Sequence, residues 1–275
     1  MNPWFETIAV ILVALLGVLL GRMFSALRKH FWLLGYIPPL LVIAMMAAAR
    51  FSDALAFIAP VCWITAGRAR FVVLSFAVPM GLITLLSRLP RKFEKVAVCT
   101  LTAVVVSWFG ILPFLFPALI RGRLSNLATQ LDSNGICYQT TNYTCGPAAA
   151  VTALNRLGLQ ANEGELAVLA HSSPVAGTTP DCLAKAINYR YAAEGLNCQY
   201  RHFDSLNQIS VSQLTLALVK DTFLSDHCVA ILEISERMVT FADPVRGRMQ
   251  MSREQFEKIW RFSGIVLKPQ PPEKI

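Results

Sequence analysis

Charged residues are scarce in this sequence. Aspartate, glutamate, lysine and arginine make up 15% of its 275 residues and hydrophobic residues make up 55%, whereas soluble domains usually contain about 25% charged and about 45–50% apolar residues. Collagen-like, disordered and wholly soluble proteins are therefore excluded. Acidic residues are scarcest in the first 124 residues, which contain three of them against twelve lysines and arginines. Because these basic residues flank apolar runs, they indicate membrane orientation rather than nucleic-acid binding.

Three further features that the sequence lacks reduce the number of possible function classes. No charged residue lies near the middle of an apolar run, which argues against a transporter, since intramembrane charges line transport paths. No Walker sequence is present, so we expect no nucleotide-binding domain. No C-x₂₋₄-C pair occurs among the C-terminal cysteines, so we expect no metal site, and the chemistry requires no organic cofactor. These cysteines are Cys137, Cys145, Cys182, Cys198 and Cys228, and their spacing specifies no disulfide pairing.

Four apolar runs are long enough to cross a bilayer, which takes about 20 residues of helix. They occupy residues 5–20, 31–49, 71–86 and 96–120. A shorter run at 54–66, interrupted by Pro60, is either a re-entrant segment or a fifth span. We therefore predict an all-α transmembrane region over residues 1–120 with four helices, five being the alternative.

The first run is predicted to remain as an anchor. Glu6 precedes it and Arg22, Arg28 and Lys29 follow it, which reverses the charge order of a signal peptide. Its N-terminus is therefore expected outside. Four spans put the C-terminal half on the periplasmic or outer side of a bacterial cytoplasmic membrane, and five put it in the cytosol. Each arrangement has seven basic residues inside and five outside, so only the shortness of 54–66 favours four.

The remainder of the chain has the composition of a globular domain. We predict a polar linker at 121–134, a domain at 135–268 and a frayed tail at 269–275. The expected elements are helices at 145–157, 163–170, 181–194 and 212–219, strands at 227–234 and 238–242 joined by a hairpin, a helix at 252–260 and a strand at 264–267. Helices followed by an antiparallel sheet indicate an α+β domain.

The sharpest local feature is the segment QTTNYTCGP at residues 139–147. Cys145 lies where a helix is predicted to begin, and a helix N-terminus favours the thiolate that a cysteine hydrolase uses as its nucleophile. Gly146 admits a substrate closely, and Pro147 suits the first helical turn. Gln139 is a candidate donor to an oxyanion. The alternative, a buried packing cysteine, is disfavoured by these flanking residues.

A thiol nucleophile needs an imidazole base and a group that orients the imidazole. His227 opens the first strand of the predicted hairpin, and Asp243 follows the second strand. Because a hairpin brings these two ends together, we expect Asp243 to contact His227. His171 and His202 have no such partner pattern. Cys145, His227, Asp243 and Gln139 therefore form the predicted catalytic set.

These residues resemble the double-glycine leader peptidases, the papain-like domain of bacteriocin-exporting ABC transporters and its stand-alone relatives. In the order typical of that family, this chain contains Gln139, Cys145-Gly146, Asp226-His227 and Asp243-Pro244. The resemblance covers residues 136–267 and implies a papain-like fold. It also implies a role for each residue of the set: nucleophile for Cys145, general base and acid for His227, orienting group for Asp243 and oxyanion-hole donor for Gln139.

The resemblance further implies cleavage after a Gly-Gly pair, in a cleft that admits only small side chains. Unlike the exporters, this chain has its membrane helices before the peptidase domain. We therefore predict a membrane-anchored cysteine endopeptidase acting on a secreted or exported peptide. Its expected partners are a peptide or protein substrate, the lipid bilayer and an export machinery, with no nucleic acid. The alternatives are a non-catalytic leader-peptide-binding module and a thiol acyltransferase, which shares the acyl-enzyme step.

Overall fold

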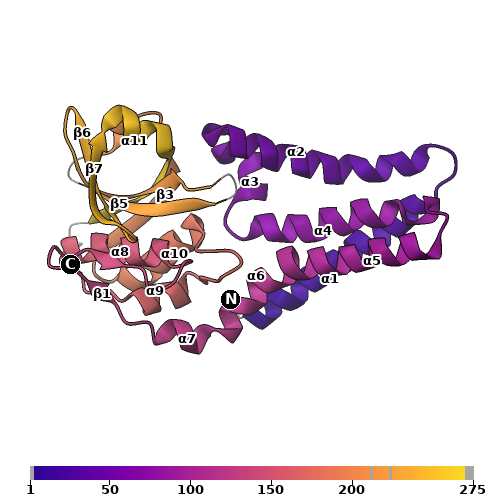
Figure 1. Ribbon diagram of the computed structural model, residues 1–275, viewed down its shortest axis with the longest axis horizontal. Helices are drawn as coiled ribbons and strands as arrows, with labels where there is room; N and C mark the ends of the chain where they lie inside the picture. Colours follow the sequence, from indigo (N-terminus) through magenta and orange to yellow (C-terminus); the bar gives the residue numbers. More distant parts are fainter. Residues whose placement is uncertain (1–2, 211–212, 223–224, 270–275) are drawn as a thin grey trace. The chain divides into compact units, whose positions relative to one another are not determined.

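The computed structural model describes residues 3–210, 213–222 and 225–269. The chain forms two compact units, Met1–Leu119 and Ile120–Ile275 (Figure 1). The first is helical, and the second combines helices with strands. The second unit takes in residues 121–134, where α7 (Arg121–Ser125) and β1 (Gln130–Leu131) lie.

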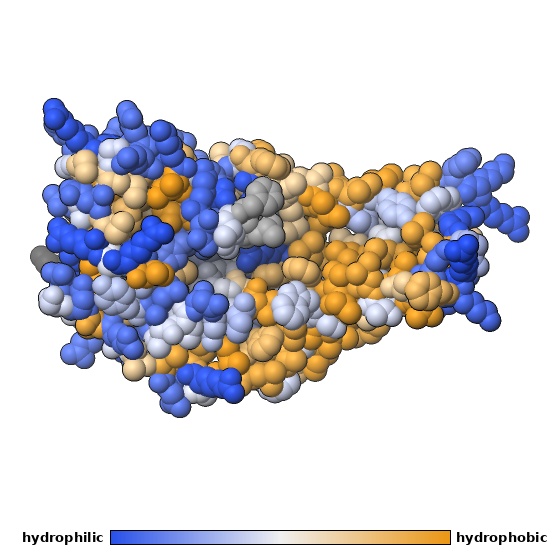
Figure 2. Space-filling model, in the orientation of Figure 1, coloured by the Kyte–Doolittle hydropathy of each residue, from blue (hydrophilic) through white to orange (hydrophobic). Residues whose placement is uncertain are grey.

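The first unit contains four helical segments long and apolar enough to cross a membrane: Trp4–Ser25, Phe31–Phe51, Ala69–Arg88 and Lys92–Leu119. They comprise α1 (Pro3–Ser25), η1 (Phe31–Tyr36) with α2 (Ile37–Phe51), α4 (Ala69–Thr84) with η3 (Leu86–Arg88), and α5 (Lys92–Val106) with η4 (Ser107–Ile111) and α6 (Leu112–Leu119). Figure 2 shows a largely hydrophobic surface over this unit. The prediction of four apolar helices is confirmed.

The alternative of a fifth span at 54–66 is wrong for the described residues. This stretch forms η2 (Asp53–Phe57) and the short helix α3 (Val61–Thr65). Neither approaches the length of about 20 residues that a bilayer requires. Pro60 and the polar residues that flank the stretch keep it from continuing as one long helix.

Helices α1 and α4 run parallel, with polar contacts at both ends. Glu6 near the start of α1 forms an ion pair with Arg68, which directly precedes α4. At the other end, the backbone N–H of Ser87 donates to Oγ of Ser25 at 2.9 Å. The two helices therefore begin on one side of the unit and end on the other.

Between those ends, α1 and α4 pack through small residues. A Cβ atom on Gly17 would collide with the carbonyl oxygen of Phe76, and one on Gly21 would collide with that of Met80. The two glycines have the G-x-x-x-G spacing that lets helix backbones approach closely in a membrane. The contact between α1 and α4 therefore depends on the absence of side chains at these positions.

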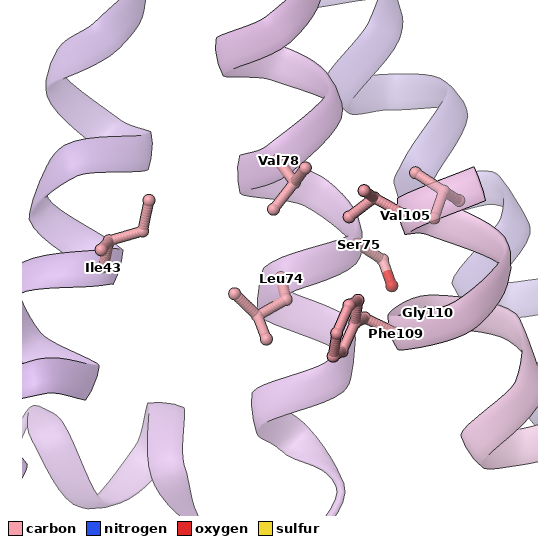
Figure 3. Close-up of a pocket in the computed structure, with 8 residues that line it drawn as sticks. Ile43, Leu74, Ser75, Val78, Val105, Phe109 and Gly110 are labelled. Carbon is pink, nitrogen blue, oxygen red and sulfur yellow. The ribbon is translucent and has the colours of Figure 1, made fainter. Parts of the chain in front are cut away.

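An apolar cavity of about 260 Å³ lies among the middle portions of α2, α4 and the α5–η4 segment (Figure 3). Its lining residues are Ile43, Leu74, Ser75, Val78, Val105, Val106, Phe109 and Gly110. The hydroxyl of Ser75 donates to the carbonyl of Phe71 within α4 at 2.6 Å. The cavity therefore matches the apolar interior of a bilayer rather than an aqueous path.

The second unit is built on a six-stranded antiparallel sheet with the strand order β3-β8-β4-β5-β6-β7. The strands are β3 (Leu196–His202), β4 (Leu214–Lys220), β5 (Asp226–Ile234), β6 (Met238–Asp243), β7 (Gly247–Ser252) and β8 (Trp260–Pro269). A separate pair joins β1 to β2 (Cys137–Tyr138). The predicted hairpin is present as β5 and β6, and the α+β fold class is confirmed.

Helices cover both faces of this sheet (Figure 1). On one face lie α8 (Cys145–Arg156), α9 (Glu163–Leu169) and α10 (Pro180–Tyr191), and on the other lie α11 (Arg253–Ile259) and η5 (Leu206–Gln208). Every residue of α8 from Gly146 to Leu154 is buried. The alanines of α8 allow this close packing, because they occupy little space between the sheet and the neighbouring helices.

The helix predicted at 212–219 is wrong, because residues 214–220 form the central strand β4. Leu216 and Leu218 pack with the α8 side of the core, whereas Ala217 and Val219 pack with the α11 side. A strand buried on both faces shows no alternation of polar and apolar residues. Strands β3 and β7, which are the sheet edges, were not predicted. Residues 211–212 and most of the predicted tail, 270–275, lie outside the described residues.

We expect Gly17→Leu to destabilise the first unit, because the added side chain must push α1 away from α4. Overpacking costs about 1–3 kcal/mol, so thermal unfolding of the detergent-solubilised protein should begin at a lower temperature. Gly122→Leu adds the same side chain where nothing lies within 4 Å and serves as the control. Equal unfolding temperatures for Gly17→Leu and wild type would contradict the packing argument.

Candidate active site

Cys145 is the first residue of α8, the helix at the centre of the second unit. The residue before it, Thr144, makes no side-chain cap to the helix. Its Oγ1 instead accepts a hydrogen bond from the N–H of Thr141 at 3.2 Å. The positive end of the α8 dipole, where Cys145 lies, is therefore not offset by a capping side chain.

A loop before α10 packs tightly beside the start of α8. A Cβ atom on Gly146 would lie 3.1 Å from the Leu183 side chain and 3.3 Å from that of Thr178. The hydroxyl of Thr178 donates to the carbonyl of Tyr143 at 3.1 Å and lies 2.6 Å from the hydroxyl of Ser172. Glycine at position 146 thus lets Thr178 of this loop and Leu183 of α10 approach the start of α8 closely.

His227 and Asp243 meet across the β5–β6 hairpin. Nε2 of His227 lies 2.9 Å from Oδ1 of Asp243. The same carboxylate oxygen accepts the backbone N–H groups of Val245 at 2.8 Å and Arg246 at 3.4 Å. The turn after β6 therefore holds the carboxylate in position for the imidazole.

The charges around His227 favour its protonated form. Burial by itself lowers the pKa of His227, but hydrogen bonds to Asp243 and Cys145, together with the charges of both groups, raise it from 6.5 to about 10. Burial raises the pKa of Asp243, whereas hydrogen bonds from His227, Val245 and Arg246 bring it below its ordinary value. At neutral pH these directions support an imidazolium at His227 paired with a carboxylate at Asp243.

Gln139, the fourth residue of the predicted set, lies beside the turn that follows Asp243. Its backbone N–H donates to the carbonyl of Pro244 at 2.9 Å. Its side-chain oxygen is buried without a hydrogen-bond partner among the described residues. The structure thus brings Cys145, His227 and Asp243 into one site with Gln139 next to it, and backbone contacts hold Gln139 in place.

Two residues near the site were missed by sequence reasoning. Arg261 of β8 forms an ion pair of 2.8 Å with Asp226, the residue before His227. Glu163 is fully buried and accepts hydrogen bonds from Thr140, the residue after Gln139. Each contact joins residues more than twenty positions apart in the sequence. A local sequence pattern cannot predict such a contact.

The remaining cysteines of this unit lack the same surroundings. All seven cysteines of the chain are free thiols. Burial raises the pKa of Cys137 and Cys198 to about 12 and that of Cys228 well above its ordinary value, so these thiols resist ionisation. Within residues 3–210, 213–222 and 225–269, no three His, Cys, Asp or Glu side chains cluster as metal ligands.

We expect Asp243→Asn to lower the pKa of His227 from about 10 toward its ordinary value, because a neutral amide stabilises the imidazolium less than a carboxylate does. NMR titration of the His227 ring measures this shift. Asp204→Asn, which removes an exposed carboxylate without a contact to His227 among the described residues, is the control. An unchanged His227 titration in Asp243→Asn would contradict the assigned cause.

Comparisons with known proteins agree with this geometry. Residues 133–274 match the peptidase C39 family. An uncharacterized protein of Methanothermobacter thermautotrophicus is 33% identical over 146 residues, which cover 53% of this chain and 95% of that protein. An uncharacterized protein of Methanothermobacter marburgensis is 31% identical over 137 residues, covering 50% of this chain and 89% of that protein.

Two solved structures are also similar. One is the peptidase domain of Streptococcus ComA, a bi-functional ABC transporter, with a TM-score of 0.41 and 21% identity over 48% of this chain and 96% of that chain. The other is a double glycine motif protease from an AMS/PCAT transporter in complex with the leader peptide, with a TM-score of 0.41 and 15% identity over 52% and 93% of the two chains. Since the family match spans more than half of its residues, this chain belongs to the peptidase C39 family.

Proposed function

We propose that this protein is a membrane-anchored cysteine endopeptidase that cleaves a secreted or exported peptide after small residues of the Gly-Gly type. The observation that carries the proposal is the 2.9 Å contact of His227 with Asp243, together with the interaction of His227 with Cys145 at the start of a largely buried helix. Membership of the peptidase C39 family supports the same reaction class. The four apolar helices of the first unit support the anchor.

The proposed reaction starts from a Cys145 thiolate and a His227 imidazolium. The thiolate attacks the carbonyl carbon of the scissile bond, and the side-chain amide of Gln139 donates a hydrogen bond to the resulting oxyanion. As the C–N bond breaks, His227 gives its proton to the leaving amine, and a thioester remains on Cys145. Neutral His227 then takes a proton from the water that hydrolyses the thioester, which restores the thiolate and the imidazolium.

The preference for small residues follows the family resemblance and has support in the packing beside Cys145. Thr178 and Leu183 lie close to the Cα atom of Gly146. The hydrogen bond from Thr178 to the carbonyl of Tyr143, together with the hydroxyl contact between Thr178 and Ser172, holds this loop against the start of α8. A substrate residue next to the scissile bond therefore meets a firmly held wall, which favours glycine over larger side chains.

We expect purified wild-type protein to cleave a double-glycine leader peptide, and Cys145→Ala to lose at least about a thousandfold in kcat, as removal of a covalent nucleophile does. Mass spectrometry of the products measures the cleavage site. Cys182→Ala removes another half-buried thiol and should retain wild-type activity. Equal cleavage by wild type and Cys145→Ala would remove Cys145 from the mechanism, and binding of the leader without cleavage would favour a non-catalytic module.

The proposal includes the side of the membrane. Four spans return the chain to the side on which α1 begins, and α1 and α4 run parallel. Cytoplasmic loops carry the excess of basic residues. Seven basic residues lie in the loops and helix ends on one side of the four spans: Arg22, Arg28, Lys29, Arg88, Arg91, Lys92 and Lys95. The opposite end has five, so the peptidase unit is proposed to lie on the periplasmic or outer side of a bacterial cytoplasmic membrane.

We expect alkaline phosphatase, which is active only outside the cytoplasm, to be active when fused after Ile275. The same enzyme inserted after Pro90, in the loop between the third and fourth spans, should be inactive, because the excess of basic residues retains that loop in the cytoplasm. Enzyme activity normalised to fusion abundance measures the difference. The reverse pattern of activities would put the peptidase unit in the cytosol.

A further inference from the structure

A buried glutamate outside the predicted catalytic set contacts the segment that carries Gln139. Glu163 is 0% exposed. Its Oε1 accepts the backbone N–H of Thr140 at 2.9 Å, and its Oε2 lies in hydrogen-bond contact with the hydroxyl of Thr140. Among the described residues, these are the hydrogen bonds of the Glu163 carboxylate. Burying a carboxyl group costs free energy unless the group is hydrogen-bonded. Both hydrogen bonds that offset this cost come from one residue, Thr140.

Glu163 itself is held firmly. It is the first residue of α9, where free helical N–H groups favour a negative side chain. The side chain of Asn162 caps this helix by accepting the N–H of Glu165 at 3.0 Å. The backbone N–H of Glu163 donates to Oγ1 of Thr129 at 3.0 Å. The carboxylate therefore extends from a fixed point toward Thr140.

The contacted segment connects β2 to α8 and is fixed at three consecutive residues. The N–H of Gln139 donates to Pro244, in the turn after Asp243. The N–H of Thr140 donates to Glu163, and the N–H of Thr141 donates to Thr144, the residue before Cys145. Two of these anchors belong to the site itself, and Glu163 is the one supplied from outside it.

The side chain of Gln139 makes no anchoring contact through its oxygen, which is buried and unpartnered. Its position therefore depends on the backbone on either side of it. We propose that Glu163 is a positioning residue that sets the place of the Gln139 amide by holding Thr140. This inference rests on the proposed function, because it gives Glu163 a role only through the oxyanion that Gln139 stabilises. A misplacement of about 1 Å in a catalytic group is enough to slow a reaction substantially.

The inference is tested with the full chain in detergent, using a double-glycine leader peptide and a peptide aldehyde ending in glycinal. The aldehyde forms a tetrahedral adduct with Cys145 whose oxygen occupies the oxyanion position, whereas alkylation by iodoacetamide requires no oxyanion. We expect Glu163→Gln to lower kcat about tenfold, which is less than the roughly 10²–10³-fold effect of losing an oxyanion donor outright. KM and the alkylation rate of Cys145 should stay within about twofold of wild type, and aldehyde affinity should fall by the same factor as kcat.

A double-mutant cycle separates positioning from general stability. In a Gln139→Ala background, Glu163→Gln should cause no further loss, because the donor that it positions is already absent. The inference would be overturned if the losses in kcat from Gln139→Ala and Glu163→Gln were additive, or if Glu163→Gln left kcat unchanged. It would also be overturned if alkylation of Cys145 slowed by the same factor as kcat. Glu165→Gln, two positions along the same helix, removes an ion pair with Arg190 at the surface and should leave kcat unchanged.

Two further outcomes keep this inference distinct from the proposed function. Absence of cleavage by the wild type would contradict the proposed function, whereas normal cleavage by both wild type and Glu163→Gln would contradict only the role of Glu163. If Glu163→Gln does not fold, Thr140→Val decides, because it removes the hydroxyl donor to Glu163 and retains the backbone N–H. A fall in both kcat and aldehyde affinity with constant KM in Thr140→Val supports the inference, and wild-type values contradict it.

Discussion

The peptidase unit depends on a charge pair kept at the edge of a hydrophobic core. Burial opposes the protonated form of His227, and only the flanking negative groups of Asp243 and Cys145 reverse that effect. Asp243 stays ionised in turn because His227 and the turn after β6 donate hydrogen bonds to it. The start of α8, the start of β5 and the end of β6 must therefore lie close together. The antiparallel pairing of β5 with β6 and the packing of α8 on these strands bring them there.

The backbone around this pair is anchored by hydrogen bonds that do not involve the side chains of the candidate catalytic residues. Gln139 is held through its N–H, and its side-chain oxygen stays unpartnered. Burial of α8 from Gly146 to Leu154 fixes the direction of the helix that carries Cys145. The candidate catalytic side chains are thus positioned mainly by the backbone that carries them, which is the arrangement that the proposed reaction requires of a preorganised site.

The helices of the first unit are packed by a different interaction from the one that packs the second unit. In a bilayer, apolar side chains gain little by contacting each other, because lipid tails are equally apolar. Close backbone approach at Gly17 and Gly21 then provides the contact between α1 and α4, and polar contacts join the two helices at their ends. The second unit, by contrast, excludes water from two core layers on either side of its sheet, which is the usual driving force of a water-soluble domain.

Local features of the chain were enough to predict the four apolar helices, the start of α8 at Cys145 and the β5–β6 hairpin, because each depends on residues that are neighbours in the sequence. The family motif likewise depends on short segments, and with the hairpin it identified His227 and Asp243 as partners. Strand β4 could not be recognised, since burial on both faces removes the alternation that marks a strand. The burial of Glu163 and the ion pair of Arg261 with Asp226 were decided by the tertiary structure alone. These contacts join residues that are far apart in the sequence. The partner of a carboxyl group therefore cannot be identified until the fold brings the two residues together.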